Sequence, residues 1–171
     1  VFVRNGATWT EQQRLTASDG AANDNFGGTI SISGDTLMIG SPGNDVGPNV
    51  DQGSVYVFAR NGDMWSEQTI ILANDGGARN AFGRTVKIDG DTAVFGKSRN
   101  PFATVIDPAV YIFVRNGTTW QQQQRLSVCE PSASGECAFG RRFAIKGDTL
   151  AIGNWFLNSG ASTAVGGVYI F

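Results

Sequence analysis

One pattern of landmarks occurs three times along the chain, each time in the same order. Each copy contains an Asn-Gly pair followed by Trp, a Phe-Gly pair, a Gly-Asp-Thr triplet and a Val-Tyr-x-Phe run. The Phe-Gly pairs begin at Phe26, Phe82 and Phe139, and the landmarks recur at a period of 55 to 57 residues. A tandem repeat of this kind constrains the chain to a fold built from copies of one unit.

The stretches between the landmarks indicate strands. In the first unit we expect strands at residues 29–33, 36–39, 54–59 and 65–72 because β-branched and aromatic residues are concentrated there. The pairs Gly34-Asp35 and Asn61-Gly62 separate neighbouring strands, and two-residue links of this type are typical of tight hairpins. No segment has a helical period. Each unit is therefore predicted to be an antiparallel sheet of four strands.

Four-stranded sheets repeating at this period predict an all-β fold made of β-propeller blades. We expect one domain over residues 1–171, with repeats at approximately 1–56, 57–111 and 112–171. Propellers usually have four to eight blades, so three units are expected to be a stretch of a larger propeller of about seven blades. A six-bladed dimer of three-blade chains, and a three-fold β-trefoil or β-prism, are the alternatives.

The Phe-Gly strand, the Gly-Asp turn and the following Gly40-Ser41-Pro42 resemble the FG-GAP repeat, and the resemblance covers essentially the whole chain. The resemblance implies blades like those of the integrin α-chain propeller. It also implies an extracellular or cell-surface location and a role in adhesion or protein binding. The motif is specific for a fold and says less about function.

The turn between the first two strands differs from the integrin pattern. Integrin-type blades often carry a calcium loop of several Asp residues there, whereas this chain has only two-residue links, which end at Asp35, Asp91 and Asp148. Calcium takes six to eight oxygen ligands, and so short a turn does not wrap around the ion. We therefore expect no integrin-type calcium site and no cofactor.

The composition excludes several classes of function. The chain has no histidine, which excludes Ser-His-Asp and Cys-His catalysis and histidine-ligated zinc. A net charge of −2 does not favour a nucleic-acid partner, and no apolar run is long enough to span a membrane. We expect no enzymatic activity; the remote alternative is a glycosidase that uses two carboxylates.

The loop after the second strand differs strongly between the three units, while the strands change little. Variable loops on a constant scaffold are where binding functions usually lie. We expect a protein or glycan ligand to contact charged and aromatic residues of these loops, namely Asp45, Asp51, Lys97, Arg99, Trp155 and Phe156. The alternative for Trp155 and Phe156 is that they pack their loop onto the scaffold.

Three further sites are predicted with less distinctive signals. Asp19 and Asp24 offer oxygens to a cation, although a turn stabilised by Asp side chains explains them equally well. Cys129 and Cys137 enclose one segment and are expected to form a disulfide, the alternative being two reduced thiols. Asn116 begins an Asn-Gly-Thr acceptor for N-glycosylation.

The outer strand of each unit presents a sheet edge, which can pair with another chain. A structural role in a surface layer or filament, assembled from further copies or blades of the same protein, is therefore the alternative to ligand binding. Exposed variable loops favour binding, whereas loops that are buried in contacts favour assembly.

Overall fold

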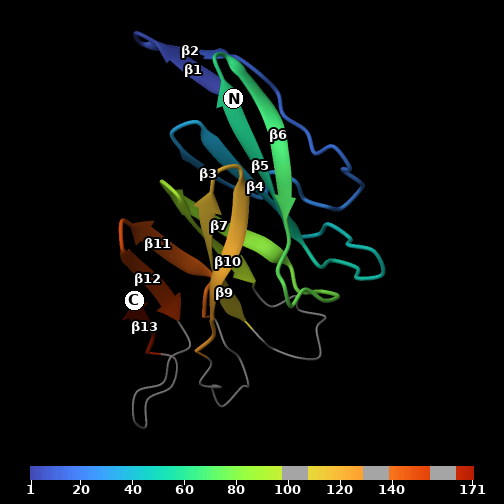
Figure 1. Ribbon diagram of the computed structural model, residues 1–171, viewed down its shortest axis with the longest axis vertical. Helices are drawn as coiled ribbons and strands as arrows, with labels where there is room; N and C mark the ends of the chain where they lie inside the picture. Colours follow the sequence, from blue (N-terminus) through green and yellow to red (C-terminus); the bar gives the residue numbers. More distant parts are fainter. Residues whose placement is uncertain (98–107, 129–138, 155–164) are drawn as a thin grey trace.

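The computed structural model describes residues 1–97, 108–128, 139–154 and 165–171, and in this part of the chain every regular element is a strand (Figure 1). Four antiparallel sheets follow one another along the sequence. They are a hairpin of β1 (Phe2–Asn5) and β2 (Thr8–Glu11); a sheet of β3 (Thr29–Ser33), β4 (Thr36–Ser41), β5 (Ser54–Asn61) and β6 (Met64–Ile71); a sheet of β7 (Phe82–Asp89), β8 (Thr92–Lys97), β9 (Ala109–Asn116) and β10 (Thr119–Leu126); and a sheet of β11 (Arg142–Lys146), β12 (Thr149–Asn154) and β13 (Gly167–Ile170).

The strand order confirms the predicted four-stranded unit. In both complete sheets each strand pairs with the next strand along the chain. The expected strand at residues 29–33 is β3 without change, while β4 and β5 are two residues longer at their ends than predicted. Gly34 and Gly62 adopt φ values of 55° and 61° in the hairpin turns, a region that glycine enters at no steric cost.

The sheets stack face to face, with alternate residues of one strand facing opposite neighbours. In β4, Leu37 and Ile39 join a cluster with the N-terminal segment, whereas Met38 joins the cluster shared with the next sheet. In β8, Phe95 faces back toward the first complete sheet and Val94 faces the third. The strands β4 and β8 therefore bury side chains on both faces of their sheets, as inner strands of propeller blades do.

The Phe-Gly pairs lie where neighbouring sheets meet. Phe82 and Phe139 are fully buried, and the Phe82 ring packs against Phe95 and Tyr111 at centroid distances of 5.5 and 5.3 Å. Each of these two residues belongs to a hydrophobic cluster formed between neighbouring sheets. Phe26 is only half-buried, because the N-terminal hairpin covers less of its sheet than a complete blade would.

In the second and third units, the glycine of the Phe-Gly pair contacts the glycine that precedes the loop of the sheet before it. A Cβ atom on Gly40 would lie 2.0 Å from the Gly83 carbonyl oxygen, and one on Gly96 would lie 2.7 Å from the Gly140 carbonyl oxygen. Gly83 also has a φ of 79°. The two glycines of the repeat motif are thus explained by one backbone-to-backbone contact between sheets.

The acidic residue of the Gly-Asp turn is engaged with the third strand of its own sheet. Asp35 forms an ion pair with Arg60 at 2.7 Å, and Asp91 forms one with Arg115 at 2.6 Å. Both arginines also lie over a tryptophan ring of the same sheet, at Trp65 and Trp120. A local structural contact therefore accounts for both aspartates.

A hydrogen bond links the turns of neighbouring sheets. The Ser33 hydroxyl accepts from the Gly90 amide at 3.1 Å, and one repeat later the Asp89 carboxylate accepts from the Gly147 amide at 2.7 Å. The Gly147 hydrogen bond, followed by the hydrogen bond from Lys146, lowers the pKa of Asp89 below its ordinary value of 3.8. The carboxylate is thus stabilised in its ionised form in the folded state.

We expect Asp89→Asn to lower the thermal midpoint at neutral pH. A folded-state pKa below the unfolded value contributes stability above the unfolded pKa, and this contribution is lost as the pH falls through the folded pKa. The midpoints of the wild type and the variant should therefore converge below about pH 4. Scanning calorimetry from pH 7 to pH 2 tests this, and a constant difference across that range would contradict it.

Candidate functional site

The two ends of the stacked sheets differ in character. One end, the turn end, carries the tight hairpins at residues 34–35, 62–63, 90–91, 117–118 and 147–148. The opposite end, the loop end, carries the links between sheets at residues 12–28 and 72–81 and the loop at 42–53. Because each first strand runs from the loop end to the turn end, the residues after each Phe-Gly pair lie at the loop end.

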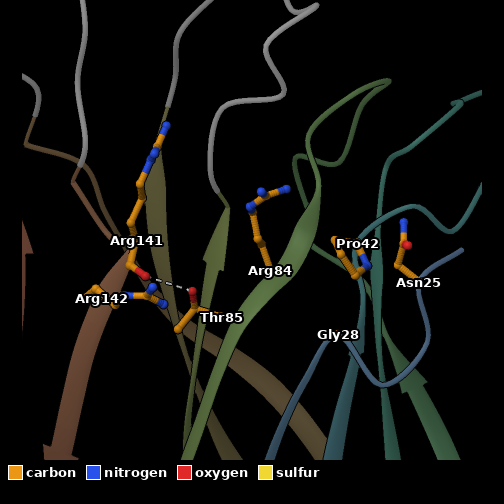
Figure 2. Close-up of a pocket in the computed structure, with 7 residues that line it drawn as sticks. All are labelled: Asn25, Gly28, Pro42, Arg84, Thr85, Arg141 and Arg142. Atoms are coloured by element: carbon orange, nitrogen blue, oxygen red, sulfur yellow. Dashed lines mark hydrogen bonds between the residues drawn. The ribbon is translucent and has the colours of Figure 1, made fainter.

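The first strands of the three larger sheets lie side by side, since β7 contacts both β3 and β11. Their starting residues surround a pocket of about 580 Å³ at the loop end, shown in Figure 2. Such a volume lies within the range of small-ligand sites. The lining residues the structure describes are Asn25, Gly28, Pro42, Arg84, Thr85, Arg141 and Arg142.

Positive charge dominates this pocket, which we call the arginine pocket. Three of its lining residues are arginines, and no acidic residue is among the described residues that line it. Arg84 and Arg142 are solvent-exposed. In Figure 2 Arg84 and Arg141 extend beyond the strand ends, while Arg142 is directed toward Thr85. The Thr85 hydroxyl donates to the Arg141 carbonyl oxygen at 3.0 Å, which links β7 to the start of β11.

Three arginines elsewhere in the described sheets have carboxylate partners, whereas Arg4 of β1 donates to the Gly6 carbonyl oxygen. Arg60 pairs with Asp35, Arg115 with Asp91, and Arg125 with Asp75. In contrast, Arg84 and Arg142 form no ion pair within the described ranges. Arg84 and Arg142 are thus exposed and have no ion-pair partner among the described residues. Guanidinium groups in this state are suited to bind an anionic ligand.

A second polar cluster at the loop end is buried. The Tyr56 hydroxyl donates to Asp19 at 2.6 Å, and Asn44 donates to Asp24 at 3.5 Å and to the Tyr56 oxygen at 3.4 Å. Asp24 also accepts from the Ala21 amide at 2.7 Å. Burial raises the pKa of Tyr56, and the hydrogen bond to Asp19 raises it further. The tyrosine therefore stays a neutral donor.

The same contact recurs one repeat later. The Tyr111 hydroxyl donates to Asp75 at 2.8 Å, and Arg125 lies 3.0 Å from the other Asp75 oxygen. Burial raises the pKa of Tyr111, with the hydrogen bond to Asp75 as the next cause. The recurrence indicates that the aspartates after β2 and β6 fix the links between sheets that follow these strands. Within the described residues, no group of three or more acidic or cysteine side chains gathers as a metal site would require.

Asp45 and Asp51, predicted as ligand-binding residues, are brought together. The Asp45 carboxylate accepts from the Asp51 amide at 2.8 Å, and Asp51 adopts a φ of 53°. These interactions shape the loop at residues 42–53. Lys97 is placed differently from the exposed position expected for it, because it is the last residue of β8 and only 7% exposed.

The other predicted site residues divide into two groups. Arg99, Cys129, Cys137, Trp155 and Phe156 lie outside the described residues, so their roles stay predictions. Asn116 lies at the exposed end of β9, where its carbonyl accepts from the Thr119 hydroxyl at 2.8 Å. Its predicted glycosylation would be at the turn end, opposite the arginine pocket.

Sequence reasoning missed the arginine pocket, although a signal was present. Arginine follows the Phe-Gly pair directly in the second and third units, at Arg84 and Arg141, while Gly28 occupies this position in the first. The charge at this position therefore differs between the repeats, as the sequence of the variable loops does. Only the side-by-side arrangement of β3, β7 and β11 shows that these positions meet.

A comparison with known protein families identifies the repeat. The sequence model of a family described as FG-GAP repeat matches residues 9–58 and 65–113, which together make up more than half of the chain. No curated protein matches the chain significantly. No helix in the described part of the chain is long and apolar enough to cross a membrane.

Proposed function

The chain belongs to the FG-GAP repeat family, and from this premise we propose that it is a non-enzymatic extracellular module that binds a protein or glycan through its loop end. The proposal includes closure of the sheets, with further blades, into a β-propeller. FG-GAP repeats often serve binding or adhesion, which supports the class of function.

The observation that carries the proposal is the arginine pocket at the loop end. It combines a small-ligand volume with charged groups that have no acidic counterpart among its described lining residues. At the turn end, by comparison, Asp35 and Asp91 are paired with Arg60 and Arg115. The tight turns therefore lie at one end of the sheets, and the proposed binding site lies at the other.

Two matched substitutions test which end binds. Val50 lies in the loop at residues 42–53 and is 54% exposed, while Met64 lies at the turn end and is 66% exposed. We expect Val50→Glu to weaken binding of any ligand found by screening immobilised oligosaccharides and secreted proteins, and Met64→Glu to leave it unchanged. Equal effects of the two variants on every such ligand would contradict a binding role for the loop end.

A second candidate function is assembly, favoured by two exposed apolar faces. Ile30 and Ile32 of β3 are 63% and 59% exposed, whereas Val86 and Ile88 at the matching positions of β7 are buried against the preceding sheet. Val168 and Ile170 of β13 are exposed at the other end of the stack. The two faces have the residue types of the buried contacts between sheets, so a second copy of the chain is a suitable partner for each.

Light scattering of the 171-residue chain tests assembly. We expect a native mass above 18.1 kDa, since contacts between these faces would bury apolar side chains. Ile32→Lys should return the chain to a monomer, and Met64→Lys, an exposed apolar residue away from these faces, should not. A wild-type chain that is monomeric at high concentration would exclude self-assembly through these faces.

A further inference from the structure

We propose that the arginine pocket is a binding site for the carboxylate or sulfate group of an acidic oligosaccharide. This inference rests on the proposed function, because it names the ligand class of the same end of the molecule. It goes further in assigning the contact to Arg84 and Arg142. Neither residue belongs to the variable loops.

The first step is that the arginines lie at the starts of neighbouring strands. Arg84 lies two residues into β7, and Arg142 begins β11. The backbone contact between sheets, represented by Gly96 against Gly140, holds the starts of these strands next to each other. Like charges on neighbouring strands repel one another, and a bound anion reduces that repulsion.

The second step concerns what the guanidinium groups bind. Arginine presents a planar fork of N–H donors that matches two oxygens of a carboxylate, sulfate or phosphate. The chain as a whole carries a net charge of −2, so general attraction of anions to a basic protein does not explain the cluster. The positive charge is local, as a specific anion site requires.

The third step favours a sugar over an acidic peptide. Around the arginines, Asn25 donates through its amide nitrogen to the Asn23 carbonyl and Thr85 donates to the Arg141 carbonyl, which leaves the Asn25 amide oxygen and the Thr85 hydroxyl oxygen as acceptors for sugar hydroxyl groups. The only apolar side chain among the described lining residues is Pro42. Protein ligands usually bind through buried aromatic or arginine anchors in well-packed pockets, and an open polar pocket of this kind provides none.

Titration calorimetry of the chain with trigalacturonic acid is the test. We expect binding of the trimer, no binding of neutral maltotriose, and affinity that falls as salt is added. Arg84→Gln and Arg142→Gln should each weaken binding by about tenfold or more, the factor equivalent to one charge-assisted hydrogen bond. Arg60→Gln, which removes an exposed arginine at the turn end, is the matched control and should bind as the wild type does.

Arg84 and Arg142 are exposed, so the thermal midpoints of their Gln variants should stay within a few degrees of the wild type. A sulfated disaccharide serves as a second probe and distinguishes a sulfate from a carboxylate source. Triglutamate binding as tightly as either sugar would overturn the assignment to an oligosaccharide. Unchanged affinity in both Gln variants, or no binding of any acidic sugar, would overturn the site.

The outcome separates this inference from the proposed function. If a screened ligand loses affinity with Val50→Glu but not with Arg84→Gln or Arg142→Gln, the anion site fails while binding at the loop end stands. If no ligand depends on the loop end, both fail together.

Discussion

Replacing Gly40 with alanine is expected to lower the free energy of unfolding by about 3 kcal/mol, at the upper end of the usual cost of overpacking. The added Cβ would lie 2.0 Å from the Gly83 carbonyl oxygen. Gly40 is paired with strands on both sides, and Gly83 lies in the irregular start of β7. To relieve this steric clash, the two complete sheets have to move apart. Urea unfolding measures the change, which should appear as a lower midpoint at an unchanged slope.

Gly153 provides a matched control for this prediction. It occupies the position of Gly40 in the third repeat, but a Cβ there would meet Arg142 at ordinary contact distances, 3.6 Å from its carbonyl oxygen and 3.9 Å from its Cβ. Gly153→Ala should therefore change the unfolding free energy by less than about 0.5 kcal/mol. Equal tolerance of both substitutions would show that the glycine contact does not hold the sheets together.

Phe82→Ala is expected to cost about 4 kcal/mol, the range found when a buried phenylalanine is truncated. The side chain is fully buried and packs on Phe95 and Tyr111. Its removal leaves a cavity between rigid sheets, which collapse poorly. Urea denaturation gives the value.

The first repeat again offers the comparison. Phe26 makes similar edge contacts with Tyr56 at 5.2 Å but is only half-buried, so Phe26→Ala should cost roughly half as much as Phe82→Ala because less apolar area is lost. If Phe26→Ala proved as costly as Phe82→Ala, burial between complete sheets would not be the source of the effect.

Much of the fold could be predicted because its determinants are local. Asn61-Gly62 and Gly34-Asp35 define hairpins by their own backbone preferences, and the period-two pattern of β3 defines its length. The contact between Gly40 and Gly83 could not be predicted in this way. It joins residues of different sheets, and nothing near either glycine in the sequence identifies its partner.

The candidate site was predicted less well for a related reason. Sequence variation pointed to loops, whereas Arg84 and Arg142 are strand residues whose importance depends on the stacking of β7 and β11. Lys97 was predicted to belong to a variable loop, but it is the last residue of β8 and is buried. For Asp19 and Asp24 the sequence left two possibilities, and hydrogen bonds to Tyr56 and the Ala21 amide now occupy these carboxylates.

Ligand binding at the loop end through the arginine pocket is tested most directly by backbone NMR of the chain titrated with sodium sulfate at constant ionic strength. We predict saturable amide shifts at Gly28, Arg84, Thr85 and Arg142, with the turn-end glycines Gly34, Gly90 and Gly147 unchanged. Shifts spread evenly over all arginines, including Arg60 and Arg115, or no saturable shift at the pocket, would contradict the account.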